Sequence, residues 1–141
     1  MSQDEVRGSC LCGAVEYAIP TGTGNFQYCH CSRCRKTGGA AHAANLAVPA
    51  EQFRWLKGEN QVTQYVHASA KRFCNAFCKT CGSKLPWITR DGKWVIVTAG
   101  TLDGDPGVRP FQSIFWGSRA PWYVMPTDLP AFEEIPSSGS K

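Results

Sequence analysis

The stretch Cys78–Gly82 reads CKTCG, and together with Cys10–Gly13, which reads CLCG, it decides the fold. Each segment holds two closely spaced cysteines and ends in glycine. A glycine at this place can adopt a positive φ, which turns the chain so that backbone N–H groups face the sulfur atoms. Two such turns predict a closed four-thiolate site, and closed tetrahedral sites are structural. The alternative is two unrelated turns that contain buried cysteines.

A third cluster, Cys29–Cys34, reads CHCSRC and offers three thiolates. Three protein ligands with an open position are typical of a catalytic zinc. The alternative is a closed structural site, whose fourth ligand would be one of His30, His42, His67 and Cys74. We expect His30, held between two cysteines, to point away from the metal.

Basic residues follow the third cluster closely, namely Arg33, Arg35 and Lys36. Positive charge beside cysteines stabilises thiolates and attracts anionic ligands. We therefore consider these three residues as substrate-binding candidates. For each of them taken singly, a solvated basic turn is an equally good interpretation.

The chain contains eight cysteines, a number that fits either disulfides or metal sites. Cysteines separated by one or two residues form a bridge only with strain, whereas one metal ion can bind several of them on a tight turn. A disulfide framework would also need a secretory signal, and the first residues lack its basic and apolar regions. Metal is therefore favoured, with zinc ahead of an iron–sulfur cluster, which thiolate ligands alone do not distinguish.

The 141 residues suffice for one domain, and 43% hydrophobic residues can form a real core. We assign residues 1–135 to a zinc-binding domain and residues 136–141 to a flexible tail. No apolar stretch approaches the ~18 residues of a membrane span. We expect a soluble, cytoplasmic protein that does not bind membranes, as a monomer or a homodimer.

The formal net charge of +4 suggests nucleic-acid binding only if the cysteines are neutral. Seven thiolates on two zinc ions would reduce the charge to about +1. General DNA affinity then loses its compositional support. Nucleic acid is therefore an unlikely partner.

Short strand patterns dominate the chain, and turn signals rich in glycine, aspartate and proline separate them. The expected strands are Ala14–Ile19, Phe26–Cys29, Ala41–Val48, Phe53–Leu56, Val62–Val66, Leu85–Thr89, Trp94–Ala99 and Ser113–Trp116. At most one or two short helical turns are expected, at Ser32–Lys36 and Asp128–Phe132. The sequence predicts an all-β domain of short antiparallel strands that metal holds together.

Three cysteine segments in this order resemble the glutathione-dependent formaldehyde-activating enzyme family, which includes the centromere protein V group. The match runs from about Val6 to Phe132. Its motifs are Gly8–Val15 (GSCLCGAV), Cys29–Gly38 (CHCSRCRKTG), Phe77–Leu85 (FCKTCGSKL), Gly100–Asp103 (GTLD) and Ser118–Trp122 (SRAPW).

The resemblance implies an all-β fold of the β-tent type with two zinc ions per chain, the second of which can be lost. It implies a structural zinc on Cys10, Cys12, Cys78 and Cys81. It implies an active-site zinc on Cys29, Cys31 and Cys34. The implied activity is that of a zinc-dependent carbon–sulfur lyase, in which formaldehyde and glutathione, a small thiol, combine reversibly as S-hydroxymethylglutathione.

Two residues depart from the family pattern: Cys74 lies outside it, and Ser113 stands where a histidine is expected. The proton-transfer residue is therefore not assigned. Two other functions stay open. One is a hydrolase-type zinc enzyme that uses the same pocket, and the other is a non-catalytic zinc module that binds protein or nucleic acid.

Overall fold

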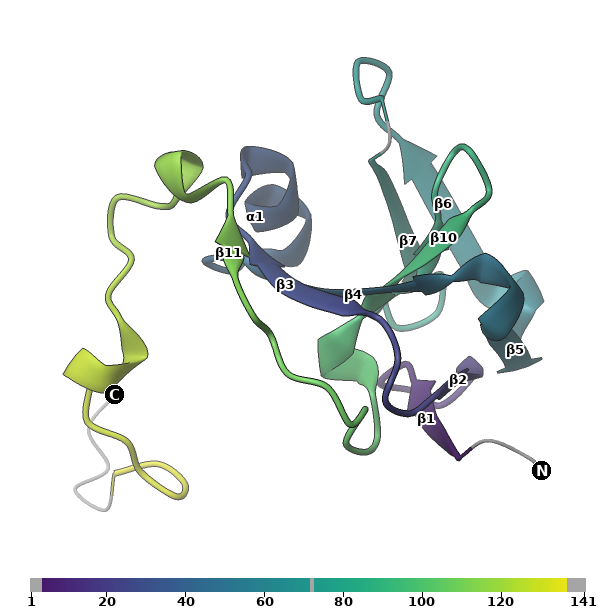
Figure 1. Ribbon diagram of the computed structural model, residues 1–141, viewed down its shortest axis with the longest axis horizontal. Coiled ribbons are helices and arrows are strands. Elements are labelled where there is room, and N and C mark those ends of the chain that lie inside the picture. The colour runs from purple at the N-terminus through teal and green to yellow at the C-terminus, as the bar shows by residue number, and fades with distance from the viewer. Residues whose placement is uncertain (1–3, 72, 137–141) are drawn as a thin grey trace.

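A computed structural model describes residues 4–71 and 73–136 of the chain. Within these residues the protein is mostly β, as expected, with three small sheets and one α-helix (Figure 1). No helix in the described part has the length and apolar character needed to cross a bilayer. Apart from Pro136, the expected tail at 136–141 lies outside the described residues, so the domain boundary stays a prediction.

The first sheet joins the N-terminal hairpin to a later strand in the order β1-β2-β5. The second has the order β11-β3-β4-β10-β9 and forms the centre of the molecule, and the third has the order β6-β7-β8. The strands are β1 (Glu5–Ser9), β2 (Glu16–Pro20), β3 (Asn25–Cys29), β4 (Ala43–Pro49), β5 (Arg54–Lys57), β6 (Val62–Val66), β7 (Cys74–Cys78), β8 (Lys84–Leu85), β9 (Trp87–Ile88), β10 (Trp94–Thr98) and β11 (Ser113–Ile114).

Neighbouring strands are antiparallel except β11, which pairs in parallel with β3. Helix α1 (Ser32–Gly38) ends at Gly39, whose φ of 64° closes its C-terminus. It extends the turn expected at Ser32–Lys36. The other helices are single 3₁₀ turns, η1 (Ala50–Gln52), η2 (Glu59–Gln61), η3 (Ala99–Thr101), η4 (Trp116–Ser118) and η5 (Pro126–Asp128).

Two apolar clusters form the core, because alternate residues of each strand point to the same side. The first lies between β2, β4 and β10 and centres on Tyr17, Leu46 and Val97. The second surrounds β7, where Cys74, Ala76 and Cys78 are buried at alternate positions. Trp55 packs against both clusters and joins them.

Several sequence expectations need correction at the element level. The segment expected as one strand at Leu85–Thr89 is two short strands, because buried Pro86 separates β8 from β9. The expected strand at Ser113–Trp116 ends at Ile114, where Phe115 adopts a left-handed conformation. The helical turn expected at Asp128–Phe132 lies two residues earlier, as η5, which starts at Pro126.

Candidate metal centres

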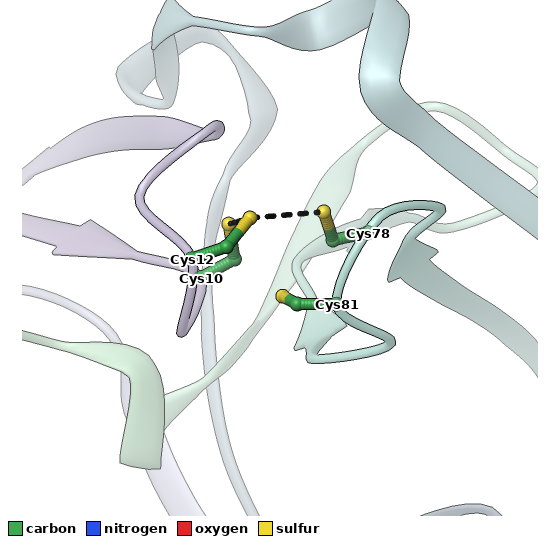
Figure 2. A group of neighbouring side chains, drawn as sticks. All are labelled: Cys10, Cys12, Cys78 and Cys81. Atoms are coloured by element: carbon green, nitrogen blue, oxygen red, sulfur yellow. Dashed lines mark hydrogen bonds between the residues drawn. The ribbon is translucent and has the colours of Figure 1, made fainter.

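Four cysteines from two distant turns meet at one point (Figure 2). Cys10 and Cys12 lie on the turn between β1 and β2, Cys78 ends β7, and Cys81 lies on the turn between β7 and β8. Glycine follows each pair, and the φ angles of Gly13 and Gly82 are 80° and 78°. Glycine favours this left-handed conformation, which residues with a side chain rarely adopt, so both turns have the backbone that the sequence pattern predicts.

The spacing of the sulfur atoms fits one tetrahedral zinc ion. Cys10 Sγ lies 3.6 Å from Cys12 Sγ, which lies 3.9 Å from Cys78 Sγ. A Zn–S bond of about 2.3 Å requires neighbouring sulfurs about 3.8 Å apart in a tetrahedron. All four sulfur atoms lie within 4.8 Å of one another, so the set needs little adjustment to hold the ion.

Hydrogen bonds favour the thiolate form of Cys10 and Cys81. The Val15 amide donates to Cys10 Sγ at 3.3 Å. The Ser83 hydroxyl lies 3.2 Å from Cys81 Sγ, and hydrogen bonds from the side chain and backbone of Ser83 lower the pKa of Cys81 to about 5. A thiolate is the form that binds metal, so the turn prepares Cys81 as a ligand.

The second group contains Cys29, Cys31 and Cys34, whose sulfur atoms also lie within 4.8 Å of one another. Cys29 ends β3, Cys31 caps the N-terminus of α1, and Cys34 lies inside the helix. The Cys34 amide donates to Cys31 Sγ at 3.4 Å. A hydrogen bond from the Cys34 thiol, the largest effect, lowers the pKa of Cys29 to about 6. This donor set fits a three-thiolate zinc site with one open position.

His30 lies between two of these cysteines but contacts aromatic rings. The ring is fully buried, and its centroid lies 4.9 Å from His42, 5.0 Å from Trp116 and 5.3 Å from Tyr123. Neither ring nitrogen has a hydrogen-bond partner within the described residues. Burial lowers the pKa of His30, and the neighbouring charge of His42 acts in the same direction.

None of the candidates for a fourth ligand joins the three sulfur atoms in the described part of the chain. His42 stacks on Tyr28, with ring centroids 4.3 Å apart. His67 Nδ1 lies 2.9 Å from the Ser69 hydroxyl. Cys74 is buried in the second core cluster, where burial raises the pKa of its thiol. The structure therefore groups three cysteines, and it places the four alternative ligands elsewhere.

The three basic candidates separate into two places. Arg33 and Lys36 line a groove of about 380 Å³ beside α1. Arg35 turns elsewhere: its Nε atom is buried and lacks a partner within the described residues. The rest of the groove is formed by Ser32, Thr37, Tyr65, His67 and Phe73.

Sequence reasoning missed the residues that other elements bring to this groove. Tyr65 lies on β6 and Phe73 directly precedes β7, and both strands belong to a different sheet from the strands that flank α1. The Lys84 ammonium donates to Asn75 Oδ1 at 2.7 Å and to Thr37 Oγ1 at 3.4 Å. Burial lowers the pKa of Lys84, while the nearby Cys34 opposes that change. In the sequence Lys84 stands three residues after Cys81, but its position beside Thr37 of α1 follows only from the pairing of β7 with β8.

Ser113, where the family resemblance led us to expect a histidine, lies at the start of β11. It is exposed and pairs with Tyr28, while Ile114 pairs with Cys29. The Ile114 carbonyl accepts a hydrogen bond from the His30 amide at 3.0 Å. The strand therefore runs directly beside the three-cysteine group.

The chain is similar to known proteins both in sequence and in fold. A family model described as glutathione-dependent formaldehyde-activating enzyme matches residues 5–118. A candidate glutathione-dependent formaldehyde-activating enzyme of Halomonas elongata is 32% identical over 108 residues, which cover 71% of this chain and 67% of that protein. A crystal structure of a Rhodobacter sphaeroides protein is similar with a TM-score of 0.60 and 26% identity, covering 76% of this chain and 98% of that one.

Proposed function

Because the chain belongs to the glutathione-dependent formaldehyde-activating enzyme family, we propose that it is a zinc-dependent carbon–sulfur lyase. In the synthetic direction it would join glutathione and formaldehyde as S-hydroxymethylglutathione. The observation that carries the proposal is the position of the groove. Arg33 and Lys36 line it on the same short helix that carries Cys34. The basic groove therefore lies along the helix that carries Cys34, and the three cysteines themselves are not part of its lining.

The proposed reaction conserves all atoms and needs no oxidant. A bond forms between the thiol sulfur of glutathione and the carbonyl carbon of formaldehyde, and the thiol proton ends on the aldehyde oxygen. Cleavage reverses both changes. A zinc ion held by Cys29, Cys31 and Cys34 would supply a soft Lewis acid, whose affinity suits a sulfur-containing substrate better than water.

The residues of the groove would bind and orient the peptide thiol. Glutathione carries two carboxylates, and the charges of Arg33 and Lys36 complement them. The rings of Tyr65 and Phe73 provide apolar walls for the rest of the tripeptide. Lys84 holds the Thr37 hydroxyl and adds positive charge near Cys34. Orientation of the thiol toward the three-cysteine group is the contribution expected from this chain.

We further propose two zinc ions per chain and a cytoplasmic location. The four-cysteine group would hold a structural ion, and the three-cysteine group would hold the catalytic ion. All eight cysteines are free thiols in the structure. Reduced cysteines and glutathione are both typical of the cytosol.

The test is the rate at which formaldehyde hydrate and S-hydroxymethylglutathione interconvert, measured by NMR exchange spectroscopy on the zinc-loaded protein. We expect the protein to accelerate this exchange above the spontaneous rate. Cys34→Ser should abolish the acceleration, because it removes a ligand of the catalytic ion. Cys74→Ser is the matched control, since Cys74 lies in the second core cluster and outside both cysteine groups.

Two results would contradict the proposal. If the fully loaded protein leaves the exchange rate unchanged, this reaction is not its function. If Arg33→Gln and Lys36→Gln leave the glutathione concentration dependence unchanged, the groove does not bind the substrate. Acceleration with a different thiol would keep the lyase class and change the substrate.

A further inference from the structure

The C-terminal arm, defined as residues 122–136, exposes apolar side chains along its whole length. In Figure 1 it runs from η4 down one side of the molecule, away from the sheets. The exposed fractions are 65% for Trp122, 47% for Val124, 49% for Met125, 53% for Leu129, 59% for Phe132 and 81% for Ile135.

The arm has defined local structure although it leaves the sheets. The Asp128 amide donates to the Met125 carbonyl at 2.9 Å, and the Leu129 amide donates to the Pro126 carbonyl at 3.1 Å. These bonds form the η5 turn, with Pro126 at its first position. The order of the arm therefore comes from its own turn and prolines, which reduce the entropy lost when it binds a surface.

A strained residue precedes the arm. Phe115 follows β11 with a φ of 55°, and it is the one non-glycine residue with positive φ in the described part of the chain. Such a conformation costs of order 1–3 kcal/mol and persists where the surrounding structure requires it. Here it follows the last pair of β11 with β3, and the chain between it and the arm still contacts the core through buried Ala120.

The exposed apolar area of the arm reaches the upper end of what a monomer shows. The six exposed side chains together present roughly 600–700 Å² of accessible surface, whereas the largest apolar patch of a monomer is about 300–600 Å². A patch of this size marks an interaction site. The arm also lies beyond the family match, which ends at Ser118.

We propose that the C-terminal arm packs against a second copy of this chain in a symmetric dimer. In a two-fold arrangement the same patch serves both copies, so each arm meets a surface of matching chemistry. That surface includes Phe111 and Phe115 at the root of the arm, which are 62% and 61% exposed. Two arms and the surfaces they cover reach the roughly 1,200–2,000 Å² that a stable interface buries.

The dimer contact would begin at the wall of the three-cysteine group. Tyr123, next to the exposed Trp122, packs against buried His30 with ring centroids 5.3 Å apart. His30 in turn lies between Cys29 and Cys31. The arm is thus anchored beside the three-cysteine group before it extends away from the sheets of its own chain.

Analytical ultracentrifugation of the full-length, zinc-loaded protein tests the proposal. We expect a mass twice the 15.4 kDa of the chain. The double variant Leu129→Asp with Phe132→Asp should raise the dimer dissociation constant roughly a hundredfold or more, because four buried apolar groups become charged. Both side chains are exposed, so the variant should keep its zinc content and melting temperature as a monomer.

Ile88→Asp is the matched control, because Ile88 on β9 is 48% exposed and lies outside the arm. It should remain dimeric. A wild-type protein that stays monomeric at tens of micromolar would overturn the proposal. A dimer that survives the double variant would also overturn it, as would one that only Ile88→Asp dissociates, since the interface would then lie on the sheet.

Discussion

Cys12 and Cys78 lie 66 positions apart in the sequence, and their sulfur atoms lie 3.9 Å apart. Cys12 belongs to the turn that leads into β2 of the first sheet, and Cys78 ends β7 of the third sheet. A metal ion at this point joins two sheets that share no strand. In contrast, the three-cysteine group lies within one short segment of chain. The two groups should therefore differ in what they contribute to stability.

Replacing Cys81 by serine should cause a much larger loss of stability than replacing Cys34. The metal at the four-cysteine group closes a long loop, and its binding energy is folding energy of about 10 kcal/mol in small zinc domains. Cys34 shares a six-residue segment with its partners and cross-links little chain. Thermal unfolding of both variants checks this. Equal decreases in melting temperature would show that the three-cysteine group is structural and would favour a binding module over an enzyme.

The zinc ions should also leave in a fixed order. We expect two zinc ions per chain after purification without chelator, and a competing chromogenic chelator should remove one of them first. Three protein ligands bind the ion less tightly than four. Zinc release should therefore show a fast phase and a slow phase. The same measurement on Cys34→Ser shows which group releases its ion first, because this variant should lack the fast phase. Loss of the slow phase in its place would reverse the assignment of the two sites.

The cysteine pattern predicted both groups, because spacing within a tight turn depends on only a few residues. Both glycines that follow the cysteine pairs of the four-cysteine group have the positive φ that the pattern requires. Strand β7 was missed because its buried alternate residues are Cys74, Ala76 and Cys78, which are too small to read as an apolar alternation. Strand β1 was missed for a related reason. It buries Gly8, whose missing side chain leaves room for the ring of Tyr17.

The groove could not be predicted because three separate segments form it. Arg33 and Lys36 were candidates by their position after the cysteines, and the structure places both on the groove. It directs Arg35 elsewhere, because successive residues of a helix point in different directions. Tyr65 and Phe73 reach the groove through the pairing of β6 with β7, and strand register depends on contacts across the whole fold.

Tyr17→Phe should lower the free energy of unfolding at neutral pH. It should also make this free energy fall less steeply as the pH rises above about 10. Tyr17 is fully buried, and its hydroxyl lies 2.6 Å from the Thr101 hydroxyl. Loss of this hydrogen bond should cost about 1 kcal/mol, while Thr101 keeps its bond to the Thr98 carbonyl.

The pH effect of Tyr17 follows from its raised pKa, for which burial is the main cause. The folded state keeps the phenol proton at a pH where the unfolded state, with a pKa of about 10, releases it. The contribution of protonated Tyr17 to the free energy of unfolding is therefore fully present below about pH 10, and above that pH it falls by up to ~1.4 kcal/mol per pH unit. Urea unfolding from pH 8 to 11 measures both proteins. Parallel curves would show that Tyr17 does not cause the alkaline loss.

Gly58→Ala should disturb the four-cysteine group, although Gly58 is not a ligand. Its φ is 76°, and an added Cβ would collide with the backbone carbonyl of Ala14 and lie 3.1 Å from Val15 Cα. Ala14 follows the turn that holds Cys10 and Cys12, so the chain must move where the metal binds. Gly92 provides the control, because its φ is 75° and an added Cβ there meets nothing within 4 Å. Gly92→Ala should cost about 1–2 kcal/mol from the left-handed conformation alone. Gly58→Ala should cost clearly more and should lose its slow-phase zinc faster. Equal melting temperatures for the two variants would mean that the Ala14 turn yields without strain and that its close packing does not support the metal site.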